Sequence, residues 1–323
     1  MFFRRVELVN KRLMVTGASG FLGSALLARL LREDRDVMAV GRSAVPLALQ
    51  TVQVKSYSDI EPLNAILGSI DTIVHCAARA HVMDDESEDP LAEYRKVNVD
   101  GTLNLARKAA DAGVRRFVFV SSIKVNGERT EPGKPFTEDQ APTPEDAYGV
   151  SKQEAEIALT ALAQETGIEV VIVRPPLVYG RGVRGNFASM IKWVERGIPL
   201  PLGAVWNKRS MVALDNLVDL IVTCMDHPAA ANEVFLAGDG QDLSITELLR
   251  ELGKAAGTPA RLIPVPAGVL ACGAGLLGKR AVAQRVLGSL QVDITKAREL
   301  LGWHPPITVD EGLRRCFDLE NKH

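Results

Sequence analysis

The sequence predicts an α/β protein built on an open parallel sheet with helices on both of its faces. Short apolar runs alternate with helical patterns through the first two-thirds of the 323 residues. The runs are apolar throughout, as expected for parallel strands that are covered on both faces. Between the first run and the first helical pattern lies the glycine-rich segment TGASGFLG, residues 16–23. This succession of strand, turn and helix predicts a doubly wound sheet.

The predicted strands are short apolar runs, many of them β-branched, and amphipathic patterns of helical period separate them. The strands are expected at 13–16, 37–40, 52–54, 72–76, 117–120, 169–173 and 234–236. The helices are expected at 25–32, 94–112, 148–166 and 215–225. From residue 243 onward, helical patterns are interrupted by prolines.

Composition narrows the class of protein. With 46% hydrophobic residues the chain can bury a large core, and its net charge of -2 gives no reason to expect a nucleic-acid partner. The four cysteines show no CxxC spacing and the five histidines no metal-ligand pattern, so no metal site is predicted. The longest weakly polar run, 267–278, is shorter than the roughly 20 residues of a membrane span. We expect a soluble, cytoplasmic protein without a signal peptide.

The glycine spacing at 16–23 is the pattern of a dinucleotide-binding turn. Gly17 permits the tight turn, Gly20 leaves room for a pyrophosphate, and Gly23 lets the helix pack closely on the strand. The N-terminus of the helix then offers free N–H groups to the phosphates. We therefore predict a Rossmann-type dinucleotide-binding domain at 11–174 and 210–237.

The composition changes after Arg174. The pair Pro175-Pro176 and the glycine-rich stretch 180–185 interrupt regular structure. We predict that a smaller, discontinuous C-terminal substrate domain is formed by 175–209 and 238–323.

The residues after the second strand decide between NAD and NADP. An acidic residue there accepts a hydrogen bond from the ribose 2′-hydroxyl, whereas an arginine suits a 2′-phosphate. Here Arg42 and Ser43 follow the strand, and no carboxylate does. The interpretation favours NADP(H), held by Arg42 and Ser43, and leaves NAD(H) open as the alternative.

Three further side chains suit proton transfer. Tyr148 and Lys152 are four residues apart and share one face of the predicted helix. A nearby ammonium favours the phenolate, so Tyr148 can exchange a proton with a reacting oxygen. Ser122 follows the fifth strand, at the carboxyl edge where such sheets bind ligands, and its hydroxyl can hold that oxygen.

Beyond these motifs, the chain resembles the extended short-chain dehydrogenases/reductases, and among them the nucleotide-sugar epimerases, dehydratases and reductases. The resemblance spans nearly the whole chain. The segments that carry it are TGASGFLG at 16–23, HCAARA at 75–80, NVDGT at 98–102, FVFVSSIKVNG at 117–127, YGVSK at 148–152, RPPLVYG at 174–180, RSMVALD at 209–215 and LGWHPP at 301–306.

The resemblance also implies the roles of individual residues. The catalytic residues are expected to be Ser122, Tyr148 and Lys152. Contacts to the cofactor are expected from Gly17, Ser19, Gly20, Phe21, Leu22, Gly23, Arg42, Ser43, Ala77, Ala78, Asn98, Tyr148 and Lys152. Contacts to the substrate are expected from Ser122, Asn186 and Arg209, with Arg209 gripping the nucleotide diphosphate.

The chain departs from the family pattern at several positions. Arg42 stands where NAD-retaining 4-epimerases usually carry an acidic residue, and Ser56-Tyr57 replace an Asp-Leu pair that contacts adenine. Asn126 replaces the tyrosine of the VYG element. Ile123-Lys124 replace the Asp-Glu pair of the dehydratases, which argues against dehydratase chemistry, and Lys124 stands where some epimerases carry a second hydroxyl.

The resemblance implies oxidoreductase chemistry at carbon 4 of a nucleotide-linked hexose. The favoured hypothesis is an NADPH-dependent reductase of a UDP-4-keto-6-deoxy-N-acetylhexosamine in surface-polysaccharide synthesis. The alternative is a UDP-hexose or UDP-N-acetylhexosamine 4-epimerase that retains NAD. A third hypothesis, a non-catalytic cofactor-sensing protein, gains no support from a chain that keeps all three catalytic side chains. The family often dimerises through the helices at 94–112 and 148–166, and the sequence permits such a homodimer.

Overall fold

A computed structural model describes the chain at residues 12–48, 50–57, 60–80, 87, 89–131, 133–278 and 280–317. The chain divides into two compact units. Unit 1 comprises Met1–Ser121, Asp146–Val173 and Cys224–Val234, and unit 2 comprises Ser122–Glu145, Arg174–Thr223 and Phe235–His323. The predicted assignment of a dinucleotide-binding and a substrate-binding part stays a prediction, and its outer limits at 11 and 323 lie outside the described residues.

A seven-stranded sheet confirms the predicted fold class. Its strands are β1 (Leu13–Thr16), β2 (Val37–Gly41), β3 (Thr51–Gln53), β4 (Thr72–His75), β5 (Arg116–Val120), β6 (Glu169–Arg174) and β9 (Val234–Leu236). The order is β3-β2-β1-β4-β5-β6-β9, and the pairs from β3 to β6 are parallel. The order reverses beside β1, where Thr16 pairs with Val40 of β2 and with His75 of β4. Such a reversal is where doubly wound sheets bind their ligands.

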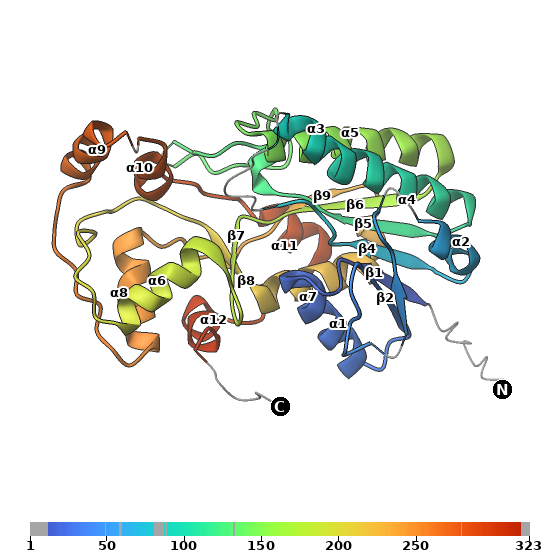
Figure 1. Ribbon diagram of the computed structural model, residues 1–323, viewed down its shortest axis with the longest axis horizontal. Coiled ribbons are helices and arrows are strands. Elements are labelled where there is room, and N and C mark those ends of the chain that lie inside the picture. The colour runs from blue at the N-terminus through green and yellow to red at the C-terminus, as the bar shows by residue number, and fades with distance from the viewer. Residues whose placement is uncertain are drawn as a thin grey trace. The chain divides into compact units, whose positions relative to one another are not determined.

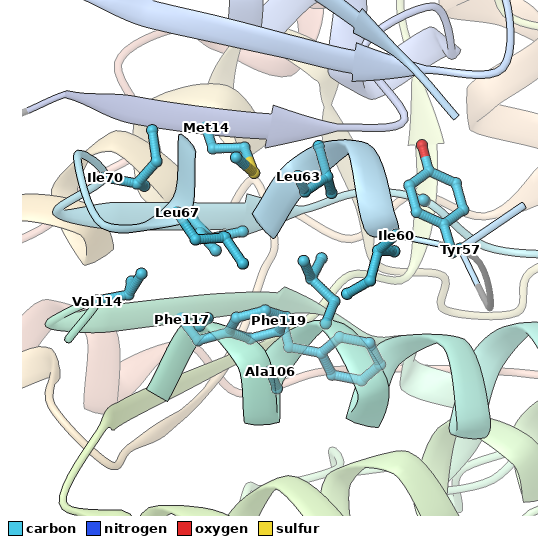
Figure 2. Packing of buried hydrophobic residues seen from close by; sticks show 14 of the residues in the cluster. Met14, Tyr57, Ile60, Leu63, Leu67, Ile70, Ala106, Val114, Phe117 and Phe119 are labelled. Carbon is cyan, nitrogen blue, oxygen red and sulfur yellow. The ribbon is translucent and has the colours of Figure 1, made fainter. Parts of the chain in front are cut away.

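Helices cover both faces of the unit 1 sheet, with α1 on one side and α4 and α5 on the other (Figure 1). They are α1 (Phe21–Arg32), α2 (Glu61–Leu67), α3 (Pro90–Arg95), the π-helical turn η1 (Lys96–Asp100), α4 (Gly101–Asp111) and α5 (Ala147–Thr166). Figure 2 shows side chains of α2, such as Leu63 and Leu67, packed against Phe117 and Phe119 of β5. Because helices cover both faces of the sheet, the strand residues on both faces are apolar.

Two predicted helices differ from the structure. The helix predicted at 25–32 begins earlier, at Phe21. Gly20 is its N-cap, and Gly23 lies within its first turn. The helix predicted at 94–112 is two helices joined by η1. Helical periodicity cannot distinguish one extra residue in a turn from a regular turn, so the sequence did not reveal the π-helix.

Unit 2 contains a small sheet that the sequence did not predict, together with helices of which those after residue 243 were expected. A two-stranded parallel sheet joins β7 (Leu177–Tyr179) to β8 (Met211–Ala213). The helices are α6 (Gly185–Glu195), α8 (Ile245–Ala255), α9 (Ala267–Leu276), α10 (Arg280–Leu287), α11 (Thr295–Leu301) and α12 (Val309–Arg315), with the 3-10 turn η2 (Ile123–Val125). The helix α7 (Leu214–Asp226) belongs in part to each unit, and the 3-10 turn η3 (Pro228–Ala230) to unit 1. Among the described residues, no helix is long and apolar enough to cross a membrane.

A buried arginine ties the end of α7 to the sheet within unit 1. Arg116 is 1% exposed. Its guanidinium donates to the carbonyl oxygens of Cys224, Met225 and His227 at 2.8, 3.1 and 2.8 Å. It also pairs with the Glu169 carboxylate at 2.7 Å. One side chain therefore satisfies the carbonyls that a helix leaves unpaired at its C-terminus.

Replacing this side chain should destabilise the protein. Arg116→Met leaves the buried Cys224 carbonyl without its donor and Glu169 without one partner. The carbonyls of Met225 and His227 keep only their bonds from Arg115 and Ala230, so we expect the free energy of unfolding to fall by about 3–5 kcal/mol. The control is Arg95→Met, which breaks an exposed ion pair with Glu154 and should change stability little. Urea denaturation measures both, and equal losses would contradict the assignment.

Candidate active site

The first residue of the turn between β1 and α1 lies so close to the end of β4 that it must be glycine. Gly17 has a φ of +68°, and a Cβ built on it would lie 2.8 Å from the backbone nitrogen of Ala77. A Cβ on Gly23 would collide with the Gly17 carbonyl oxygen. Gly20 donates its N–H to that same oxygen at 2.9 Å. Only a residue without a side chain fits at Gly17 and at Gly23.

The first turn of α1 is open to an anion. Gly20 is the N-cap and offers no side-chain cap, and the turn that begins with Phe21 and Leu22 contains no acidic residue. Ser19 and Gly20 are exposed. Unpaired N–H groups and the positive end of a helix dipole suit a phosphate. The residues present therefore fit the dinucleotide that the sequence predicts.

Tyr57 supports this turn through two hydrogen bonds, a role that the sequence did not reveal. Its phenol oxygen accepts the Gly17 N–H at 2.9 Å and donates to the Val40 carbonyl at 3.3 Å. Burial raises the pKa of Tyr57, so it stays a neutral phenol. Tyr57 is the residue that departs from the family's Asp-Leu pair, and the departure could have signalled a local role.

Ser19 and Arg42 lie at the neighbouring edge of the sheet. A Cβ built on Gly41, the last residue of β2, would lie 3.6 Å from the Ser19 Oγ. Arg42 and Ser43 follow directly and are exposed. The Arg42 carbonyl accepts a hydrogen bond from Gln53 at 2.8 Å, and its guanidinium forms no ion pair with any described residue. The structure thus brings the predicted selectivity residues to the edge beside the glycine turn.

The residues after β4 close the other side of the turn. Ala77 is buried against Gly17, whereas Ala78 is exposed. His75 is hydrogen-bonded to Thr16 at 2.8 Å and to Thr102 at 3.1 Å. Burial lowers the pKa of His75 to about 3, so the imidazole is neutral at physiological pH. His75 therefore joins β1, β4 and α4 as a structural residue.

Asn98 links the π-helical turn to the helix that carries Tyr148. Its side-chain oxygen accepts the Arg79 N–H at 2.8 Å. Its amide donates to the Arg79 carbonyl at 3.1 Å and to the Ser151 hydroxyl at 3.0 Å. Ser151 in turn donates to the Tyr148 carbonyl at 2.8 Å. Asn98 therefore fixes α5 to the segment after β4.

Lys152 is a buried ammonium aimed at the end of β5. Its Nζ donates to the Val120 carbonyl at 2.8 Å and lies 4.3 Å from the centre of the Phe119 ring. Burial lowers the pKa of Lys152 to about 8, and the charge of Glu156 opposes that shift. Tyr148 lies one helical turn earlier, half-buried, with its ring 6.0 Å from that of Tyr94. Unit 1 thus brings together the phenol and the ammonium that the sequence predicted.

The other predicted side chains belong to unit 2. Ser122 is the N-cap of η2, two residues after β5 ends, and its Oγ accepts the Lys124 N–H at 3.3 Å. Asn186 is exposed in the first turn of α6. The Arg209 guanidinium donates to the carbonyls of Arg285 and Gly288 at 2.9 and 3.2 Å. Burial lowers the pKa of Arg209.

Two of the departures from the family pattern have structural explanations within unit 2. Asn126 is buried, donates to the Thr137 carbonyl at 2.8 Å and accepts from Arg174 at 3.0 Å. Lys124 pairs with Glu128 at 2.9 Å. The described residues contain no group of three or more His, Cys, Asp or Glu side chains suited to a metal ion.

Comparison with known proteins assigns the chain to a family. Residues 13–238 match the NAD dependent epimerase/dehydratase family, and the chain belongs to it. The chain is 49% identical over 312 residues to a UDP-glucose 4-epimerase of Vibrio cholerae, covering 94% of both chains. The fold is similar to that of the crystal structure of a Thermotoga maritima UDP-glucose 4-epimerase with UDP-glucose, at 26% identity and a TM-score of 0.75 over 94% of this chain and 96% of that one. MoeE5 in complex with UDP-glucose and NAD is equally similar, at 26% identity and a TM-score of 0.75 over 94% and 96%.

These findings confirm the predicted family and its nucleotide-sugar group. They do not support the NADPH-dependent reductase or the preference for NADP(H), and the relatives favour the alternative epimerase and NAD. The roles of the individual site residues, the homodimer, the place in surface-polysaccharide synthesis and the cytoplasmic location stay predictions.

Removing the Tyr57 hydroxyl should loosen the glycine turn. Tyr57→Phe leaves the Gly17 N–H without its acceptor in a partly buried position, so we expect a loss of about 1–3 kcal/mol in the free energy of unfolding and weaker binding of NAD. Tyr94→Phe, which removes the hydroxyl of another buried tyrosine of unit 1 outside the glycine turn, is the matched control. Denaturation and NAD titration test both variants. Unchanged NAD binding in Tyr57→Phe would rule out the proposed support.

The lowered pKa of Lys152 predicts a pH dependence of stability. Between about pH 8, where the folded protein releases this proton, and the unfolded pKa near ~10.4, the unfolded chain binds more protons, so stability rises with pH. Below about pH 8 both states hold the proton, so the destabilisation by the buried ammonium is at its full size and no longer changes with pH. Relative to Lys152→Met, the free energy of unfolding of the original protein should gain roughly 1 kcal/mol from pH 7 to pH 9. A difference that does not change with pH would show that Lys152 is not desolvated.

Proposed function

We propose that the protein is an NAD-dependent 4-epimerase of a UDP-hexose. The observation that carries this proposal is the 49% identity, over 94% of both chains, to a UDP-glucose 4-epimerase. The chain also keeps Ser122, Tyr148 and Lys152, which supply the hydroxyl, phenol and ammonium that oxidation of a secondary alcohol requires.

The cofactor is proposed to be NAD, held at the turn between β1 and α1. The pyrophosphate would lie against Gly17, Gly20 and the first turn of α1, where side chains are excluded. Arg42 is then an exposed side chain beside the adenosine ribose rather than a specificity residue for a 2′-phosphate. When bound, NAD supplies the acceptor and later the donor of a hydride.

Proton transfer is proposed to fall to Tyr148. Its phenolate accepts the proton of the 4-hydroxyl while carbon 4 gives up its hydrogen with the bonding electrons. The result is a 4-keto sugar. Return of the hydride to the opposite face of the ring, with return of the proton from Tyr148 to the oxygen, yields the epimer. Proton and hydride balance over the cycle, so no external reductant is consumed.

Lys152 and Ser122 would prepare these steps. The Lys152 ammonium is fixed by the Val120 carbonyl one helical turn after Tyr148, and its positive charge favours the phenolate. The Ser122 hydroxyl would donate to the oxygen on carbon 4 and hold it for the tyrosine. The guanidinium of Arg209 would bind the diphosphate of the sugar nucleotide, and Asn186 would contact the substrate.

The test measures both the cofactor and the reaction. Protein as isolated is denatured, released NAD(H) is quantified, and UDP-glucose is incubated with native protein without added cofactor. We expect stoichiometric NAD and formation of UDP-galactose. Tyr148→Phe should keep its NAD but lose at least roughly 100-fold in rate, because proton transfer contributes about 10²–10⁴-fold.

The control is Tyr94→Phe, which alters the neighbouring aromatic ring and leaves the proton donor intact, and it should retain activity. Protein that is isolated without NAD and oxidises NADPH in the presence of a UDP-4-keto sugar would overturn the epimerase in favour of the reductase. An unimpaired Tyr148→Phe variant would remove the proposed role of this tyrosine.

A further inference from the structure

The helix α9 buries none of its residues, although its sequence is apolar. It reads AGVLACGAGL and contains no charged side chain. Val269 is 60% exposed and Leu276 86%, and Leu277, which follows the helix, is 75% exposed. Val269 and Leu276 are seven residues apart, so they lie along one face of the helix. A helix that is apolar all round is ordinarily buried, and an exposed one marks a binding surface.

The charged residues near this helix in the sequence are all basic. Residues 252–292 contain no Asp or Glu and five Lys or Arg, in a chain whose net charge is -2. Lys254 pairs with Asp310, and Arg285 pairs with Glu128. Arg261 and Arg280 are exposed, and neither forms an ion pair with any described residue. Arg280 lies against the helix, because a Cβ built on Gly275 would be 3.3 Å from its Nε. Exposed apolar side chains and an unpaired cation therefore occur together at the C-terminal end of α9.

We propose that α9 and Arg280 form a docking surface for an anionic phospholipid bilayer. Val269, Leu276 and Leu277 would enter the boundary between headgroups and acyl chains, and Arg280 would contact lipid phosphates. Ten residues of helix extend about 15 Å, which is half the thickness of a bilayer core, so the helix would lie in the interface rather than cross it.

The charge favours a membrane over a second copy of this chain. A twofold contact through the same face would bring the two Arg280 side chains together, and like charges across an interface oppose association. Anionic lipids supply the opposite charge and also the apolar phase that the leucines require. This proposal does not depend on the reaction that the protein catalyses.

The test uses full-length protein and sedimentation with vesicles of defined composition. We expect binding to vesicles of phosphatidylglycerol and phosphatidylcholine, little binding to phosphatidylcholine alone, and release by high salt. The double variant Leu276→Asp/Leu277→Asp should bind at least tenfold more weakly, and Arg280→Gln about fivefold more weakly. The matched control is Leu47→Asp, since Leu47 is 58% exposed in a distant stretch of sequence.

Circular dichroism and thermal melting confirm that each variant is folded, and size-exclusion chromatography reports self-association. Anionic vesicles bound equally by the original protein and by the double aspartate variant would overturn the proposal, as would no binding at all. Self-association that the double variant abolishes would also overturn it, by identifying a second copy as the occupant. Retention or loss of UDP-glucose epimerisation leaves these outcomes unchanged, so the proposed function and the docking surface are tested separately.

Discussion

The close approach of the β1–α1 turn to the end of β4 is the constraint on which the cofactor site depends. Gly17 packs against the Ala77 backbone, the Gly17 N–H is taken by Tyr57, and the Cys76 N–H donates to Thr16 at 3.2 Å. These contacts align the ends of three strands around a turn that begins and ends with glycine. The free N–H groups in the first turn of α1 then favour an anion as the ligand.

A second constraint lies on the other side of the sheet edge, where buried polar groups fix α5. The Lys152 ammonium donates a hydrogen bond to the Val120 carbonyl, and the Asn98 side chain bridges Arg79 and Ser151. Each of these groups is nearly inaccessible to water, so a lost partner would leave an unsatisfied charge or amide. The network therefore specifies the orientation of the helix that presents Tyr148, at the cost of desolvating an ammonium.

The sequence predicted those parts of the fold that depend on local patterns. Apolar runs identified the strands of the seven-stranded sheet, and glycine spacing identified the turn that Gly17 and Gly23 occupy. The sequence did not predict the hydrogen bond between Tyr57 and Gly17 or the one between Asn98 and Ser151, because these bonds join residues 40 and 53 positions apart. The sheet of β7 and β8 was missed for a related reason, since three-residue strands carry too little periodicity to stand out from a loop.

The choice between epimerase and reductase lies outside the catalytic side chains altogether. A hydroxyl, a phenol and an ammonium serve either direction of hydride transfer, because the proton moves along the same path in both. The reactions differ in whether the oxidised cofactor stays bound. That is a property of the whole cofactor site rather than of one residue. From the sequence alone, Arg42 is expected to decide between the cofactors because arginine suits a 2′-phosphate. In the structure Arg42 is exposed, and among the described residues only its backbone oxygen has a hydrogen-bond partner, Gln53. A flexible side chain in solvent can accept a phosphate or turn away from a ribose hydroxyl, so it discriminates weakly where a fixed carboxylate would discriminate strongly.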